Sequence, residues 1–147
     1  MANSITPALE DYLESILIIK NRGKIPRVKD IARLINVKAP SVNEALSQLQ
    51  KKGFIVHERY GYIEMTPKGL KKAKKLYKRH NLIKKFFHNI LGLEKEIAEI
   101  DACRIEHYLS NATLDRMVSF IDFIEGKSIK PDWLYNFQTK KGKIAKG

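Results

Sequence analysis

The order of short elements between residues 28 and 65 limits this chain more than any other feature. Apolar residues recur at helical spacing from Val28 to Ile35. After a short turn, Pro40-Ser41 opens a second predicted helix, which ends at Lys51-Lys52-Gly53 with two cations and a glycine. Two short helices joined by a tight turn are typical of a helix-turn-helix, in which the second helix reads DNA, although an ordinary helical hairpin has the same pattern.

The residues that follow favour the first of these two interpretations. Residues 54–58 and 62–65 are strand-like runs on either side of Arg59-Tyr60-Gly61, which predicts a β-hairpin. A hairpin directly after a reading helix is the wing of a winged-helix domain. Polar side chains near the start of the second helix suit base edges and phosphates, and the tip of the wing could reach the DNA backbone or the minor groove. The candidate DNA-binding residues are Arg27, Lys38, Pro40, Ser41, Asn43, Glu44, Gln48, Arg59 and Tyr60.

The remaining helices are predicted from caps and apolar spacing. The first begins after Thr6-Pro7 and runs to about Lys20. The others are expected at about 67–91, 94–109 and 113–125. The last of these is so apolar that we expect a dimer interface on it, with internal burial as the alternative. The fold class is therefore mainly α with a small β-hairpin wing, a winged helix-turn-helix followed by a helical dimerisation domain. We expect a DNA-binding domain at 1–70, a linker helix and metal-binding/dimerisation domain at 71–126, and a basic tail at 127–147.

Charge is distributed unevenly along the 147 residues, whose formal net charge is +12. Residues 71–91 carry eight basic and no acidic side chains, whereas residues 92–126 carry three basic and eight acidic ones. The basic part suits a polyanion such as DNA, and the acidic part indicates a different role. No apolar run is long enough for a membrane helix, no signal peptide is evident and a single cysteine excludes an internal disulfide. We therefore expect a cytoplasmic protein without a membrane partner.

A second group of residues indicates metal chemistry. Cys103, Glu106 and His107 stand at i, i+3 and i+4 of a predicted helix, which places them on one face. Thiolate, carboxylate and imidazole are common ligands of divalent transition metals. The first helix adds Asp11 and Glu14, and the long helix adds His80. Each of these residues alone also has an ordinary structural explanation, such as a buried thiol or a surface histidine.

Several strings in the chain carry a family resemblance. TPALEDYLESI, APSVNEALSQLQKKGFI, MTPKG, YKRHNLI and DACRIEHYLS together resemble the diphtheria toxin repressor and manganese transport regulator family, in its short two-domain form. The resemblance covers about residues 5–125. It implies a metal-activated, homodimeric repressor that binds a palindromic operator in double-stranded DNA. The family's metal positions correspond to Asp11, Glu14, His80, Cys103, Glu106 and His107.

The match to the family's metal positions is mixed. Manganese-type members have a carboxylate at the position of Cys103, and iron-type members have methionine at the position of Asp11. The ancillary site of the iron type uses a glutamate and a histidine where this chain has Lys84 and Glu99. We expect Fe²⁺ or Mn²⁺ as the cofactor, with Fe²⁺ slightly favoured because of the thiol, and Co²⁺, Ni²⁺ or Zn²⁺ as possible substitutes.

The expected function is regulation of metal-ion homeostasis. A metal held by ligands of both domains would lower the entropy cost of ordering the reading helices on DNA. A winged-helix transcription factor that ignores metal is the main alternative. An enzyme is a distant one, because Cys103 and His107 lack an oxyanion-hole motif or a phosphate loop around them. No small-molecule substrate is expected.

Overall fold

The structure is a computed structural model that describes residues 4–58, 61–126 and 130–140. It divides into two compact units, Met1–Tyr77 and Lys78–Gly147, and the division falls inside one long helix. The expected domain limits of 70 and 126 stay a prediction. Within the described residues, no helix is both long and apolar enough to span a membrane.

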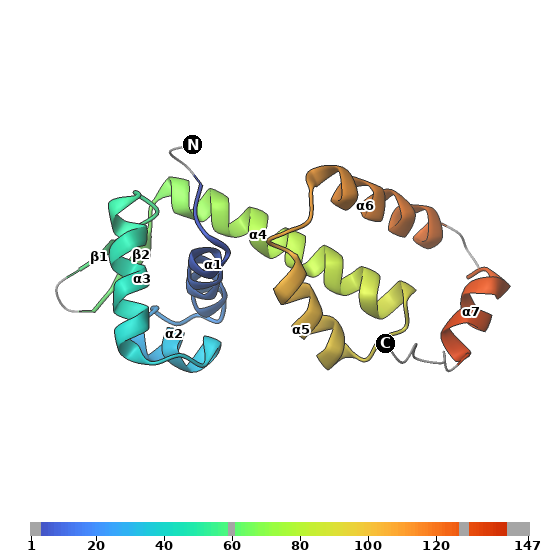
Figure 1. Ribbon diagram of the computed structural model, residues 1–147, viewed down its shortest axis with the longest axis horizontal. Coiled ribbons are helices and arrows are strands. Elements are labelled where there is room, and N and C mark those ends of the chain that lie inside the picture. The colour runs from blue at the N-terminus through green and yellow to red at the C-terminus, as the bar shows by residue number, and fades with distance from the viewer. Residues whose placement is uncertain (1–3, 59–60, 127–129, 141–147) are drawn as a thin grey trace. The chain divides into compact units, whose positions relative to one another are not determined.

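The first unit holds three helices, a two-stranded hairpin and the start of a fourth helix (Figure 1). These are α1 (Pro7–Asn21), α2 (Val28–Ile35), α3 (Ala39–Lys51), β1 (Ile55–His57), β2 (Ile63–Met65) and α4 (Pro67–Lys85). The strands are antiparallel, and Val56 lies opposite Glu64. Because α2, a tight turn, α3 and the hairpin follow one another, this unit has the order predicted for a winged helix-turn-helix.

Local signals explain where these elements begin and end. The Leu9 amide donates to Oγ1 of Thr6 over 3.2 Å, so Thr6 caps α1 as predicted. The turn between α2 and α3 depends on Asn36, whose φ of 55° is left-handed, a conformation that asparagine tolerates better than most residues. Apolar residues of α1, α2, α3 and the hairpin then form one core. The fully buried members include Leu13, Ile31, Val42, Leu46 and Leu49.

The start of α4 is held against the turn between α3 and β1. The Thr66 hydroxyl donates to the Gly53 carbonyl over 2.6 Å, and the Thr66 amide donates to the Phe54 carbonyl over 3.1 Å. Gly69 lies so close to this turn that an added Cβ would be 1.8 Å from the Phe54 oxygen. Only glycine therefore allows this approach without a shift of the backbone.

Helices are the secondary-structure elements found in the described residues of the second unit. It contains the remainder of α4, the π-helix η1 (Phe86–Ile90), α5 (Lys95–Ile105), α6 (Asn111–Glu125) and α7 (Asp132–Thr139). Figure 1 shows α5 and α6 on either side of the end of α4. Their contact is apolar: Ile83 of α4 packs with Ala102 of α5 and Leu114 of α6.

Three expectations differ from this structure. The long helix does not continue as an α-helix to Leu91 but becomes a π-helix after Lys85. The helix expected at 94–109 is shorter, because α5 ends at Ile105. The segment expected to be only a basic tail contains α7, because Leu134 is buried with Ile90, Ile121 and Ile124.

Candidate metal centre

A buried histidine–glutamate pair lies at the centre of the candidate site. His80 comes from α4, and Glu106 comes from the residue directly after α5. Nδ1 of His80 is 2.7 Å from Oε2 of Glu106, and the Glu106 side chain has no exposed surface. A buried carboxylate is costly unless it is paired, so this contact is a requirement of the fold as well as a potential ligand pair.

Arg79 holds the backbone that carries Glu106. Its Nη2 donates to the Glu106 carbonyl over 2.8 Å, and its Nε donates to the same oxygen over 3.2 Å. Nη2 also donates to the Leu109 carbonyl, and Nη1 donates to Oδ1 of Asn111 over 3.3 Å. The planar guanidinium therefore holds the segment between α5 and α6 through four hydrogen bonds.

One oxygen of Glu106 is not satisfied by these contacts. Among the described residues, Oε1 of Glu106 is buried and has no hydrogen-bond partner. Nε2 of His107 lies 3.5 Å away, beyond ordinary hydrogen-bonding distance, and the His107 side chain is only 3% exposed. A buried carboxylate oxygen beside two imidazoles is the donor chemistry that a divalent cation takes, so these residues fit a metal.

The second ring nitrogen of His80 is also engaged. Nε2 of His80 lies 2.8 Å from Oε1 of Glu99, and Oε2 of Glu99 lies 2.7 Å from Nζ of Lys84. Glu99 is on α5 and Lys84 is one helical turn beyond His80 on α4. A carboxylate therefore faces each nitrogen of the imidazole, and Lys84 pairs with the carboxylate of Glu99.

These contacts change the acidity of His80 and Glu99. Burial alone would lower the pKa of His80, but the hydrogen bonds and negative charges of Glu106 and Glu99 outweigh it and raise this pKa above its usual value. Burial would raise the pKa of Glu99, yet the hydrogen bonds and positive charges of Lys84 and His80 lower it. In the metal-free chain the imidazolium form of His80 is therefore stabilised between two carboxylates.

The structure separates the predicted metal ligands by environment. It brings His80, Glu106 and His107 together in the second unit. Cys103 is exposed, so it does not share the buried surroundings of Glu106 despite their i, i+3 spacing. Glu106 directly follows the last residue of α5, and its backbone stays helical because its amide donates to the Ala102 carbonyl over 3.0 Å. On α1 of the first unit, Glu14 is buried and Asp11 is partly buried.

Two residues with clear roles in this geometry were not predicted. Arg79 and Glu99 belong to the charge runs of α4 and α5, where a solvated surface position is the common expectation. The only signal in the sequence was the substitution of Lys84 and Glu99 at positions where the iron-type family members have an ancillary metal site. Opposite charges at both positions are consistent with the observed ion pair.

The predicted reading helix presents an exposed polar surface in the first unit. Lys38, Pro40, Ser41, Asn43, Glu44 and Gln48 are all exposed. The buried face of α3 consists of Val42, Ala45, Leu46 and Leu49, so the two faces are cleanly separated. Arg27 is also exposed, and its guanidinium lies 5.7 Å from the ring centre of Tyr62 in the hairpin. Arg59 and Tyr60 lie outside the described residues.

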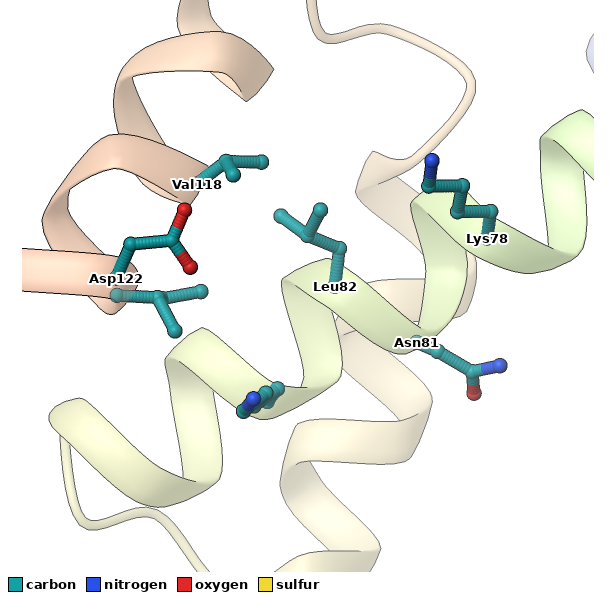
Figure 2. Close-up of a pocket in the computed structure, with 7 residues that line it drawn as sticks. Lys78, Asn81, Leu82, Val118 and Asp122 are labelled. Atoms are coloured by element: carbon teal, nitrogen blue, oxygen red, sulfur yellow. The ribbon is translucent and has the colours of Figure 1, made fainter. Parts of the chain in front are cut away.

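A shallow groove lies between α4 and α6 in the second unit. Figure 2 shows Leu82 of α4 facing Val118 and Asp122 of α6, with Lys78 and Asn81 farther along α4. Ile121 also lines the groove. Among the residues that line this groove, Asp122 alone carries a metal-ligating group. The groove therefore differs chemically from the His80–Glu106 site.

Comparison with known families accounts for both units. Residues 4–63 match the family described as "Iron dependent repressor, N-terminal DNA binding domain". Residues 66–129 match "Iron dependent repressor, metal binding and dimerisation domain". The two matches therefore assign a DNA-binding role to the hairpin-containing unit and a metal-binding role to the helical part in which His80 and Glu106 meet.

Individual relatives agree with this assignment. The HTH-type transcriptional regulator MntR of Lysinibacillus sphaericus is 38% identical over 82% of this chain and 86% of the relative. An HTH-type transcriptional regulator of Methanocaldococcus jannaschii is 35% identical over 84% of this chain and 99% of its own length. These relatives are transcriptional regulators by name.

Solved structures show the same fold. The manganese regulator SloR aligns with a TM-score of 0.71 at 28% identity, over 86% of this chain, and T. acidophilum IdeR aligns with 0.68 at 25% identity, over 80%. This chain spans 58% and 55% of those two longer chains. The expected winged helix-turn-helix with a helical domain and the expected metal-dependent DNA-binding regulator are thereby confirmed. The chain belongs to the iron-dependent repressor family, the group of the diphtheria toxin repressor and the manganese transport regulators.

Proposed function

We propose that this protein is a homodimeric repressor that binds its operator DNA when a divalent metal occupies the site around His80, Glu106 and His107. The single observation that carries this proposal is the buried Oε1 of Glu106, which has no hydrogen-bond partner within the described residues. Such an oxygen costs the fold about 1–3 kcal/mol, and a bound cation would remove that cost.

The ligand set that we propose extends beyond these three residues. Asp11 and Glu14, which the family resemblance assigns to metal binding, would add carboxylates from α1. When bound, the metal supplies a double positive charge that neutralises these carboxylates. Ligands from α1 would couple the occupancy of the site to the unit that carries α3, so metal and DNA would tighten each other's binding by the same factor. Cys103, which is exposed, has the weakest support among the proposed ligands.

Manganese is the metal that we favour for this site. The buried donors are carboxylate oxygens and imidazole nitrogens, a combination that Mn²⁺ accepts, while the thiol that favoured Fe²⁺ is exposed. Relatives such as SloR are named as manganese regulators, which agrees with this preference. Fe²⁺ is the competing candidate, and a direct comparison of the two metals distinguishes them.

We further propose how the protein meets DNA and its own second copy. The exposed face of α3, from Lys38 to Gln48, would read base edges in the major groove, and Arg27 would contact phosphate. Two copies of this chain would present two reading helices to the halves of a palindromic operator. The exposed Phe120 and Phe123 of α6 are the apolar side chains that we assign to the dimer contact.

The metal site is tested by binding Mn²⁺ to the metal-free protein in a calorimetric titration. Glu106→Gln keeps the size and the hydrogen-bonding ability of the side chain but removes its charge. We expect the affinity for Mn²⁺ to fall at least about 100-fold, more than the loss typical of a group outside the ligand set. Glu125→Gln is the matched control, because Glu125 is exposed and its carboxylate pairs with Lys85 at the surface.

Two results would contradict the proposal. If Glu106→Gln bound Mn²⁺ as tightly as the native protein, Glu106 would not be a ligand. If the native protein bound neither Mn²⁺ nor Fe²⁺, the metal-independent winged-helix factor would be the better description. A higher affinity for Fe²⁺ than for Mn²⁺ under equal conditions would overturn only the choice of metal.

A further inference from the structure

The contacts of His80 extend outward through two more side chains to the surface. Oε2 of Glu106 lies 2.7 Å from Nδ1 of His80, and Nε2 of His80 lies 2.8 Å from Oε1 of Glu99. Oε2 of Glu99 in turn lies 2.7 Å from Nζ of Lys84. We name Lys84, Glu99 and His80 the Lys–Glu–His relay. The His80 side chain is 7% exposed, whereas the side chains of Glu99 and Lys84 are 49% and 34% exposed.

An imidazole can offer only one nitrogen lone pair to a metal, and its other nitrogen must then carry a proton. Glu99 faces Nε2, and a carboxylate is an acceptor for an N–H group. In the metal-bound form this contact would keep the proton on Nε2, while Nδ1 faces Glu106. A carboxylate behind a histidine also makes the opposite nitrogen a stronger donor to a metal.

Lys84 completes the arrangement by fixing Glu99. Half-exposed glutamate side chains adopt several rotamers, and holding one of them costs entropy. The ammonium of Lys84 lies 2.7 Å from the oxygen of Glu99 that does not face His80, so the two ends of the carboxylate are held by different partners. The positive charge of Lys84 also reduces repulsion between Glu99 and the buried Glu106.

Resting on the proposed metal function, we propose that Glu99 and Lys84 are positioning residues that direct Nδ1 of His80 to the metal. Lys84 acts through Glu99, and neither side chain binds the metal itself. The ammonium group of Lys84 neutralises the charge of Glu99, a role that a second metal ion would otherwise have. The relay thus supports a metal ligand with protein side chains alone, and Lys84 and Glu99 stand at the positions where the iron-type members have an ancillary metal site.

The inference is tested with Glu99→Ala and Lys84→Met in the full chain. Circular dichroism first establishes that each variant is folded. If Glu99→Ala does not fold, Lys84→Met still tests the inference. Co²⁺ affinity is then measured by its absorption spectrum. We expect Glu99→Ala to weaken binding about 10–100-fold, the range for groups that support a metal-bound histidine. Lys84→Met should weaken it by a smaller factor in the same direction.

A double variant shows whether Lys84 acts through Glu99. If it does, adding Lys84→Met to Glu99→Ala has no further effect on Co²⁺ affinity, so the two losses are not additive. The matched controls are Lys85→Met and Glu125→Ala, which remove a lysine–glutamate ion pair of 2.8 Å between the end of α4 and the end of α6. These controls are expected to leave the affinity within about twofold of native.

A second readout reports on the ring itself. Nitrogen NMR of the histidines in the Zn²⁺-loaded native protein should show His80 bound through Nδ1, with the proton on Nε2. In Glu99→Ala this preference should weaken. Unchanged Co²⁺ affinity in folded Glu99→Ala and Lys84→Met, or binding of Zn²⁺ through Nε2, would overturn the relay and leave the proposed metal site standing. A native protein that binds no Co²⁺, Mn²⁺ or Zn²⁺ would overturn both.

Discussion

Glu106 and His80 show how a residue that costs stability can be retained for function. Glu106 has no exposed surface, and one of its oxygens lacks a partner among the described residues. Hydrophobic residues of similar volume often replace buried ion pairs with a gain in stability. A buried, incompletely satisfied carboxylate beside His80 and His107 is therefore better explained by ligand binding than by folding.

The titration of His80 gives a prediction at this scale. Its pKa is raised in the folded chain, so its contribution to stability is fully present below the unfolded pKa of about 6.5 and is lost as the pH rises through the higher folded pKa. Thermal unfolding of the metal-free protein should therefore show a decline in stability as the pH rises above about 6.5, and this decline should be absent in His80→Gln.

Glu99 does not obscure this prediction. Its lowered pKa contributes stability above its unfolded value of about 4.3, and that part is lost only as the pH falls through the folded value. His57→Gln serves as the control, because this histidine belongs to β1 in the first unit. An identical pH profile for native protein and His80→Gln would show that the pair with Glu106 does not form.

At the scale of elements, Arg79 joins α4 to the segment between α5 and α6. It donates to the Glu106 and Leu109 carbonyls and to the Asn111 side chain. Arg79→Lys retains the charge but cannot reach several acceptors in one plane. We expect a loss of about 1–3 kcal/mol in the free energy of unfolding, measured in urea. Arg116→Lys, at an exposed position of α6, should stay within about 0.5 kcal/mol of native. Equal stability of the two variants would contradict this role for Arg79.

The elements also show what a sequence can predict. The first helix and the helix-turn-helix were predictable, because the cap at Thr6, the turn at Asn36 and the glycine at 53 are local signals that tertiary contacts do not override. The helix α7 was missed, because Leu134 is its single buried apolar residue and its partners Ile90 and Ile121 come from other helices. Local periodicity cannot report such contacts.

The candidate site was predictable only in part, because some of its contacts join different helices. The structure brings His80 of α4 next to Glu106, which stands beside His107 in the motif that indicated a metal, and the metal site itself stays a prediction. Cys103 is exposed while Glu106 is fully buried, a difference that depends on tertiary contacts and that i, i+3 spacing does not report. The pair of Lys84 and Glu99 joins two helices, and no pattern within either helix predicts which surface charges will meet.

For the whole molecule, the net charge of +12 leads to a prediction about salt. If α3 reads DNA, affinity should fall steeply between 50 and 200 mM salt, by about 10³–10⁵ if six to ten phosphates are contacted. Lys38→Ala should reduce the slope of log affinity against log salt by about one, as expected for one lost phosphate contact. Lys95→Ala, at an exposed position of α5, should not. A slope unchanged by Lys38→Ala would remove this residue from the DNA surface.

The central claim is that metal occupancy controls DNA binding. The most direct measurement is fluorescence anisotropy of a labelled duplex, selected from a random pool, titrated with the protein in Mn²⁺ or in chelator. The account predicts that Mn²⁺ tightens binding about 5–150-fold, the usual range for coupled sites. It also predicts that His107→Ala loses this difference while sedimentation shows the same folded dimer as the native chain. Equal affinity with Mn²⁺ and with chelator in the native protein would contradict it.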